Sequence, residues 1–264
     1  MIDIGANLAH GSFDSDRGAV LERAWTAGLT AIVVTGSSAE SSQRALQLAR
    51  EYRGRLFATA GLHPHHASEW SDELAEKFER LGRNPEVVAL GECGLDYFRD
   101  LSPREAQRKA FAEQLALAVK LKKPVFLHQR DAHADFLPML REHRSQLMDV
   151  AVHCFTDTHS ALEDCLALDC HIGITGWICD ERRGAVLRDI ARLIPDDRLL
   201  VETDAPYLLP HNAPDDLRQT AGRRNEPAFL PWVVKSLAQV RQQTEEHIAA
   251  VTAANARRFF RLEI

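Results

Sequence analysis

The chain has 264 residues, of which 45% are hydrophobic and 27% are charged, and its formal net charge is −6. This length suffices for one large α/β domain or two small ones, and the composition is that of an ordinary globular protein. Because the net charge is negative, the protein as a whole does not attract nucleic acid nonspecifically. A local rim of basic residues is compatible with this charge.

The five cysteines lie at positions 93, 154, 165, 170 and 179 and form no Cys-x-x-Cys pair. An odd and scattered set indicates reduced thiols in a cytosolic protein rather than a disulfide framework. The first residues, Met1-Ile2-Asp3-Ile4-Gly5, contain neither a basic segment nor a long apolar stretch. We therefore expect a cytoplasmic protein without a signal peptide or a membrane span, and we expect residues 1–264 to form one domain.

Short apolar runs alternate along the chain with longer amphipathic stretches. The runs that predict strands cover residues 2–8, 31–35, 56–62, 87–92, 125–128, 150–153, 171–175 and 199–202. Helical periodicity is clearest over residues 18–27, 39–53 and 106–122, and residues 228–239 and 245–259 predict the closing helices. Ser37-Ser38 and Ser102-Pro103 are typical of helix entries, since a hydroxyl caps the first turn and Pro fits its first position.

Eight β-runs with helical connections over about 250 residues predict an α/β fold, a (β/α)8 barrel. The alternative is a doubly wound open sheet, which would place a glycine-rich phosphate loop after an early strand. The sequence contains neither a Gly-x-Gly-x-x-Gly motif nor a P-loop. In a barrel the active site lies at the carboxyl ends of the strands, where the polar residues of this chain appear.

Four predicted strands end in a residue that can bind a metal ion. Glu92, His128 and His153 end three of the runs, and Asp204 follows the last one. A carboxylate at the end of a buried strand is costly unless it is solvated, paired or bound to a metal. Each residue alone could be a hydrogen-bonded core residue. Four together, with mixed oxygen and nitrogen donors, predict a site for Mg²⁺, Mn²⁺ or Zn²⁺ at one end of the barrel.

Cys93 and Cys154 each follow a proposed ligand. Because side chains alternate along a strand, we expect both thiols to point away from the metal and to be small core residues.

Histidines and arginines at other strand ends are candidates for contact with substrate. Gly61-Leu62-His63-Pro64-His65-His66 follows the third run, and we assign His63 and His65 to substrate contacts and His66 to solvent. A solvent-facing turn or a pair of metal ligands is the alternative. The arginines that follow strand ends are Arg130, Arg182-Arg183 and Arg223-Arg224.

Guanidinium groups bind phosphate through two parallel hydrogen bonds, so we expect Arg130 and Arg224, with Asn225 beside it, to contact substrate. Aromatic residues also follow strand ends, at Tyr97, Phe98, Trp177 and Tyr207. They either pack over the barrel mouth or stack on the bases of a single strand.

Several motifs, in order and over nearly the whole chain, resemble those of the TatD deoxyribonuclease family. They are Gly91-Glu92-Cys93-Gly94-Leu95-Asp96, His128-x-Arg130-Asp131, His153-Cys154-Phe155, Glu202-Thr203-Asp204-Ala205-Pro206-Tyr207-Leu208 and Arg224-Asn225-Glu226-Pro227. The resemblance implies a TIM barrel of the metallo-dependent hydrolase type. It also implies Mg²⁺-dependent hydrolysis of DNA phosphodiesters, and the mixed oxygen and nitrogen donors would accept Mn²⁺ or Zn²⁺ in place of Mg²⁺. Further implications are 3′–5′ exonuclease action on single-stranded DNA and RNA, a cytoplasmic location and a role in repair of oxidative DNA damage.

The family's metal ligands fall on Glu92, His128, His153 and Asp204. We expect Glu92 and Asp204 to be the catalytic carboxylates as well. The first strand departs from many relatives, which carry Asp-x-His-x-His with both histidines bound to metal. The corresponding positions here are Gly5 and Asn7. We therefore expect one tight site at Glu92, His128 and His153. A second ion, held by Glu92, Asp204 and Asn7, would be weak or would arrive with substrate.

A metal-dependent amidohydrolase or esterase acting on a small molecule is the alternative function, because the same barrel serves those enzymes. They usually need the histidine pair on strand one and a bridging lysine carboxylate at strand four, where this chain has Glu92. A noncatalytic partner in protein quality control or export is a third reading. Our expectation is a monomer with single-stranded DNA or RNA as its substrate and no membrane partner.

Overall fold

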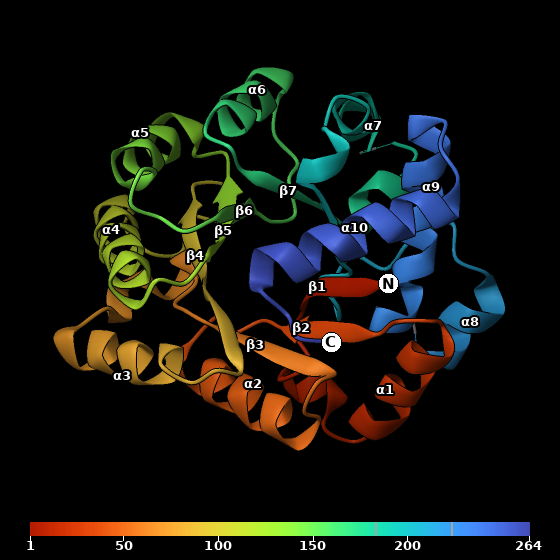
Figure 1. The fold of residues 1–264 in the computed structure, drawn as a ribbon, viewed down its shortest axis with the longest axis horizontal. Helices are drawn as coiled ribbons and strands as arrows, with labels where there is room; N and C mark the ends of the chain where they lie inside the picture. Colours follow the sequence, from red (N-terminus) through yellow and green to blue (C-terminus); the bar gives the residue numbers. More distant parts are fainter. Residues whose placement is uncertain (183, 223) are drawn as a thin grey trace.

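The computed structural model describes residues 1–182, 184–222 and 224–264. Within these residues, eight parallel strands follow one another in chain order around a barrel (Figure 1). The ladder runs from the first strand to the eighth, and the two end strands contact each other across the remaining seam. The strands are β1 Ile2–Ala6, β2 Ala31–Val34, β3 Leu56–Ala60, β4 Val87–Asp96, β5 Val125–Arg130, β6 Val150–Val152, β7 His171–Ile174 and β8 Leu199–Val201.

Helices surround the barrel on its sides and at one end. They are α1 Arg17–Thr26, α2 Ala39–Glu51, α3 Asp72–Gly82, α4 Arg104–Leu121, α5 His133–His143, α6 His159–Ala167, α7 Ala185–Ala191, α8 Asp215–Thr220, α9 Leu230–Arg241 and α10 Glu245–Phe260. Short 3-10 helices are η1 Gly11–Phe13, η2 Pro64–Glu69, η3 Gly176–Cys179, η4 Asp196–Arg198 and η5 Pro227–Phe229. In the described part of the chain, we find no helix with the length and apolar character needed to span a membrane.

Helix α10 crosses the amino-terminal end of the barrel (Figure 1). The amide of Asn255 donates to the Leu199 carbonyl at 2.8 Å, and Phe259 packs with Ile2 and Ile4 of the barrel interior. A second and larger apolar cluster lies between the strands and the surrounding helices. Because α10 closes one end, a binding site inside the barrel can open only at the carboxyl ends of the strands.

The predicted barrel and all eight predicted strands are confirmed, with ends that differ by a few residues. The largest difference is β4, which continues past Glu92 to Asp96. The expected hydroxyl cap is confirmed at Ser38, whose Oγ accepts from the backbone N–H of Ser41 at 3.1 Å. It is wrong at Ser102, because Pro103 takes the cap position of α4 and the Ser102 hydroxyl donates to the His65 carbonyl of η2 instead.

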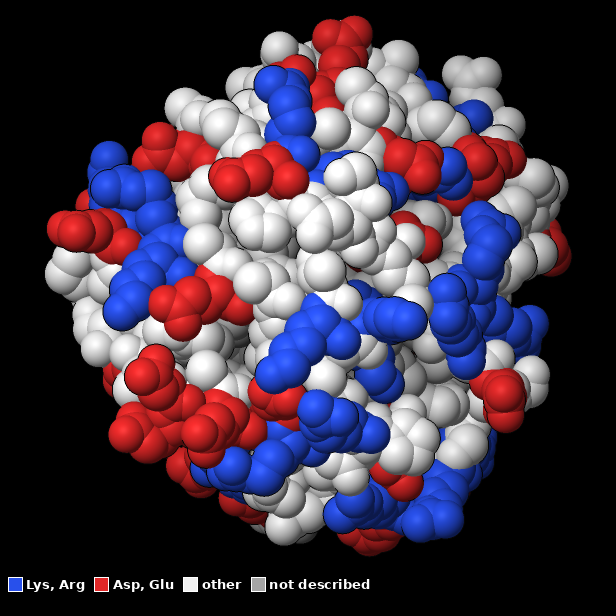
Figure 2. Space-filling view, turned by 60° about the vertical axis from the view of Figure 1, so that its left-hand side comes forward, with Lys and Arg blue, Asp and Glu red and all other residues white. Residues whose placement is uncertain are grey.

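Charged side chains of both signs are mixed on the molecular surface. Figure 2 shows Lys and Arg interspersed with Asp and Glu over the face that it draws, with neither sign covering it. This agrees with the modest net charge of −6 and leaves charge effects to local groups of residues.

Candidate metal centre

Glu92 reaches the barrel interior through an irregularity in β4. The core between strands and helices contains Leu90, Cys93 and Leu95. Side chains on one face of a regular strand are two residues apart, but Leu90 and Cys93 are three apart, so β4 contains one extra residue here. The register with β5 shifts at the same place, between Gly91 and Cys93. A bulge of this kind re-aims a side chain, and here it turns Glu92 toward the site.

Two glycines allow β4 to pass close to β5 on either side of Glu92. Gly91 and Gly94 have φ angles of 129° and 145°, which residues with a Cβ rarely adopt. A Cβ on Gly91 would collide with the Phe126 carbonyl, and one on Gly94 with the His128 carbonyl. The Gly-Glu-Cys-Gly motif is therefore a backbone requirement for placing the carboxylate.

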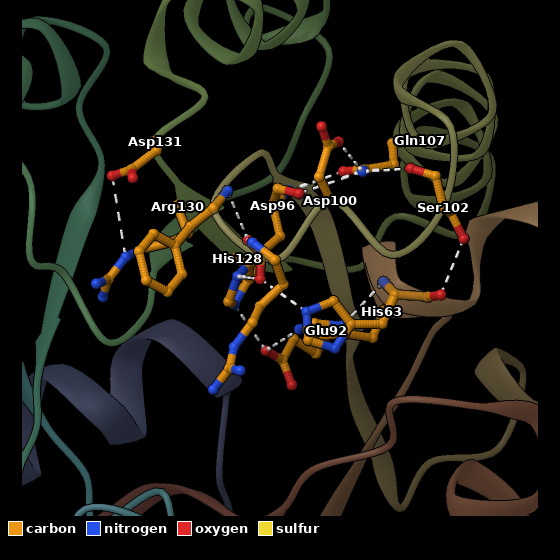
Figure 3. Close-up of polar contacts among 12 residues, drawn as sticks. His63, Glu92, Asp96, Asp100, Ser102, Gln107, His128, Arg130 and Asp131 are labelled. Atoms are coloured by element: carbon orange, nitrogen blue, oxygen red, sulfur yellow. Dashed lines mark hydrogen bonds and ion pairs between the residues drawn. The ribbon is translucent and has the colours of Figure 1, made fainter.

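Three imidazole rings converge on one oxygen of Glu92. His153 Nε2 lies 2.7 Å from Glu92 Oε1, His128 Nδ1 lies 3.1 Å from it, and His63 Nε2 lies 3.3 Å from it. Figure 3 shows His63 and His128 pointing toward this carboxylate. Donor atoms of His63, Glu92 and His128 all lie within 4.8 Å of one another, close enough to share one ion.

Asp96 extends this group toward the barrel mouth. Its Oδ2 lies 2.7 Å from His65 Nε2 and 3.4 Å from His128 Nε2. Its Oδ1 accepts the backbone N–H groups of Phe98 and Arg99 at 3.1 and 2.8 Å. His128 therefore lies between two carboxylates, and the loop after β4 is tied to the same cluster.

The charges in this cluster shift its pKa values strongly. Burial acts to raise the pKa of Glu92, but the charges of His153 and His63 and the hydrogen bonds from His128 and His153 outweigh it and hold that pKa well below its usual value. Burial lowers the pKa of the His63 imidazole to about 4. Glu92 is thus ionised and His63 neutral near pH 7, which are the forms that bind metal.

Asp204 lines the same cavity from the loop after β8. Its Oδ1 accepts a hydrogen bond from Asn7 Nδ2 at 3.0 Å, so Asn7 steadies this carboxylate. Burial raises the pKa of Asp204 to about 8, against the lowering effect of the His153 charge.

Glu202 is wholly buried beneath the histidines. Its Oε1 accepts the backbone N–H of Cys154 at 2.6 Å, and its Oε2 lies 3.4 Å from His153 Nδ1. A Cβ on Gly5 would collide with Oε2, so this carboxylate fills the space that a side chain at position 5 would take. His153 therefore has Glu92 at one ring nitrogen and Glu202 at the other.

A cavity of about 820 Å³ opens above the cluster, within the range of ligand-binding pockets. Imidazole nitrogens and carboxylate oxygens gathered in one buried group are donors that fit a divalent cation. The residues that line the cavity are Asn7, Ser37, His63, His65, His66, Glu92, Asp96, Phe98, Arg99, His128, Arg130, His153, Cys154, Trp177, Asp204, Tyr207 and Leu208.

The structure brings together most of the predicted site residues. Glu92, His128 and His153 meet directly, and Asp204 lies in the same cavity. His63, expected at the substrate, lies within the group around Glu92. The residues that sequence reasoning did not assign to the site are Asp96 and Glu202, and the available signal for each was a carboxylate at the end of an apolar run.

Two of the predicted substrate contacts lie elsewhere. Arg224 pairs with Asp16 and Glu226 at 2.7 and 2.9 Å, and neither it nor Asn225 lines the cavity. Asn225 is fully buried and donates to the Tyr207 carbonyl at 2.5 Å, so it supports the loop after β8. The acidic partners of Arg224 come from distant segments, which the local motif could not reveal.

Among the other predicted residues, one lies at the cavity as a substrate contact should, one faces solvent, and two are not described by the structure. Arg130 does line the cavity, and its Nη1 donates to Thr156 Oγ1 at 3.3 Å. His66 is exposed beside Glu69, as expected for a solvent-facing residue. The residues Arg183 and Arg223, which we also singled out, lie outside the described part of the chain.

Of the two thiols, Cys93 is buried in the barrel–helix core as predicted. The prediction for Cys154 is wrong, because that residue lines the cavity. It follows the end of β6 with a φ of 47°, so strand alternation no longer governs its direction. Burial raises the pKa of the Cys154 thiol well above its usual value, which keeps it protonated.

A parallel barrel with imidazoles and carboxylates gathered at the carboxyl ends of its strands defines a metal-dependent hydrolase of the TIM-barrel type. The family described as TatD related DNase matches residues 2–261, and the chain belongs to this family. The resemblance drawn from the motifs is thereby confirmed.

Individual relatives cover the whole chain. A Pantoea vagans protein named 3′-5′ ssDNA/RNA exonuclease TatD is 52% identical over 263 residues, which cover 99% of this chain and 100% of the relative. A protein of the same name from Erwinia tasmaniensis is 51% identical with the same coverage. Among solved structures, the TatD homologue YJJV of Escherichia coli matches with a TM-score of 0.89 at 32% identity, covering 99% of this chain and 98% of that one.

Proposed function

We propose that this chain is a metal-dependent 3′–5′ exonuclease that hydrolyses single-stranded DNA and RNA. The observation that carries the proposal is the convergence of His63, His128 and His153 on Glu92 at the floor of an open cavity. Relatives that bear the name of such an exonuclease share about half of their residues with this chain over their full length. Five free cysteines support a reducing compartment, so we assign the enzyme to the cytoplasm. We further propose that it acts as a monomer, and the family resemblance supports a role in repair of oxidative DNA damage.

We assign the tight metal site to Glu92, His128 and His153, with His63 as a further ligand. Asp204 and Asn7 would complete a weaker second site with Glu92. A bound divalent cation, Mg²⁺ in this proposal, would supply Lewis-acid chemistry toward a phosphoryl oxygen of the substrate.

The side chains around the cluster have separate tasks. Asp204, held through Oδ1 by Asn7, orients the attacking water. The charge of a bound cation would lower the raised pKa of Asp204, and the ionised carboxylate then accepts the proton of that water. His65, anchored by Asp96 and partly exposed to the cavity, donates to a phosphate oxygen. Arg130 binds a flanking phosphate, because a guanidinium at the rim can pair with two phosphate oxygens.

Digestion of end-labelled single-stranded oligonucleotides with Mg²⁺, Mn²⁺ or Zn²⁺ tests this function. We expect a 3′ label to be released at once as a mononucleotide, whereas a 5′ label should pass through a ladder of shortening products. Glu92→Gln keeps the shape of the side chain but removes its charge, and we expect it to lose activity at least 100-fold, the scale of one preorganised electrostatic group.

The competing outcome belongs to the amidohydrolase or esterase alternative. Turnover of cyclic amides or small esters, with no release of nucleotides under any of the three metals, would replace the nuclease proposal. Full activity of Glu92→Gln would instead support a noncatalytic role for the metal cluster.

A further inference from the structure

Aromatic side chains at the barrel mouth fall into two kinds. The hydroxyl of Tyr97 donates to Asp135 Oδ2 at 2.6 Å, and the Arg104 guanidinium lies 4.2 Å from its ring centroid. Tyr97 is therefore held by its own surroundings, and it does not line the cavity. In contrast, Phe98 and Tyr207 are 58% and 52% exposed, and both line the cavity. Exposed aromatic rings at the edge of a polar cavity offer flat faces to a ligand.

Phe98 lies on a loop whose backbone is anchored, and two guanidinium groups lie near its ring. The Cζ of Arg130 lies 4.8 Å from its ring centroid, and that of Arg99 lies 6.0 Å away. Arg130 is held by its bond to Thr156, and the loop is held by the backbone bonds to Asp96. An aromatic ring with guanidinium groups beside it can stack on a nucleobase while the cations pair with the neighbouring phosphates.

Phe98 and Tyr207 lie on opposite sides of the mouth. Phe98 follows β4 and Tyr207 follows β8, and these strands are four places apart in the ring of eight. The cavity that both rings line also contains Glu92 and Asp204. A single-stranded nucleic acid that crosses the mouth would contact both rings. The phosphodiester group between the two contacted bases would then face the carboxylates.

The distribution of charge around the cavity indicates the direction in which the single-stranded nucleic acid binds. Of the described residues, Arg99 and Arg130 are the arginines that line the cavity, and both lie beside Phe98. The strand 5′ of the scissile bond carries a phosphate for every nucleotide, whereas the 3′-terminal nucleotide ends in a hydroxyl. The positively charged side therefore suits the longer, more negative part of the substrate.

We propose that Phe98 stacks on the base 5′ of the scissile phosphate and that Tyr207 stacks on the 3′-terminal base. This inference rests on the proposed exonuclease function and names the two nucleobase subsites of the same cavity. Stacking uses the π-face that every base has, so these subsites hold DNA and RNA of any sequence.

The test compares substitutions with the removal of single bases. The substrates are one natural single-stranded oligonucleotide, one with an abasic 3′-terminal nucleotide and one with an abasic penultimate nucleotide. We expect Phe98→Ala to raise the KM for the natural strand by roughly 5- to 150-fold, the effect of losing one stacked base, with kcat nearly unchanged. The same change should leave the KM for the penultimate abasic strand unaltered, since its contact is already absent.

Tyr207→Ala should show the same behaviour with the 3′-terminal abasic strand. Phe98→Trp and Tyr207→Phe keep a flat ring and should restore the KM of the natural strand. Leu101→Ala is the matched control, because Leu101 is 67% exposed near Phe98 and does not line the cavity. We expect no change from it.

Equal effects of Phe98→Ala on natural and abasic strands, or no effect at all, would overturn the stacking assignment. The assigned direction would be overturned if Phe98→Ala left the KM unaltered for the 3′-terminal abasic strand and Tyr207→Ala left it unaltered for the penultimate abasic strand. Quenching of 2-aminopurine at either position reports stacking without cleavage. A wild-type protein that quenches this base but releases no nucleotide would contradict the exonuclease proposal and leave the two subsites standing.

Discussion

Glu202 illustrates how one residue outside the predicted site can support it. It is fully buried, and its carboxylate faces the ring nitrogen of His153 that points away from Glu92. Histidine ligands commonly have such a carboxylate at the second nitrogen, which orients the ring and increases its basicity. We regard Glu202 as a positioning residue for His153.

At this scale we predict that Glu202→Gln weakens metal binding by about 10- to 100-fold. The amide keeps the size of the side chain but removes the charge that holds His153. Calorimetric titration of the metal-free protein with Mn²⁺ measures the change directly. Glu163→Gln is the control, because Glu163 also lies beside a histidine but on the exposed surface. An unchanged affinity in a folded Glu202→Gln protein would show that His153 needs no such support.

The seam between β8 and β1 is the element-scale feature that positions Asp204. The backbone N–H of Asp204 donates to the Gly5 carbonyl at 2.8 Å, and that of Asn7 donates to the Ala205 carbonyl at 2.7 Å. The carboxyl of Asp3 in β1 accepts two further hydrogen bonds, from the backbone N–H of Thr203 at 3.0 Å and from its hydroxyl at 2.5 Å. The loop after β8 is thereby fixed to the first strand.

The seam should make stability depend on pH. Burial raises the pKa of Asp3 from its ordinary value of 3.8 to about 7, against the lowering effect of its bonds from Thr203 and Gly5. A carboxyl with a raised pKa in the folded state gives stability that is complete below pH 3.8 and is lost as the pH rises through 7.

We therefore expect the stability advantage of the wild type over Asp3→Asn to shrink by roughly 4 kcal/mol at most between pH 4 and pH 8. Urea unfolding at a series of pH values measures it. Asp189→Asn, at an exposed position, should show no such trend. A wild-type advantage that stays constant across this range would mean that Asp3 is ionised throughout.

Across the whole molecule, sequence patterns predicted the barrel because each βα unit carries its own apolar periodicity. They also predicted Glu92, His128, His153 and Asp204, since strand ends of a parallel barrel meet at one rim. The β4 bulge could not be predicted from alternation, because its extra residue is visible only against the partner strand. The network of Arg224 was equally inaccessible, since Asp16 lies far away in the chain.

The net charge of −6 gives nucleic acid no general attraction to the molecule. We hold that Glu92 gathers the histidines so that together they bind one divalent ion tightly. Titration of the metal-free protein with Mn²⁺, followed by calorimetry, tests it most directly. We predict one tight site in the wild type and a weaker second one, with the tight site lost in Glu92→Gln while circular dichroism shows an unchanged fold. Equal stoichiometry and affinity in the wild type and in Glu92→Gln would contradict it.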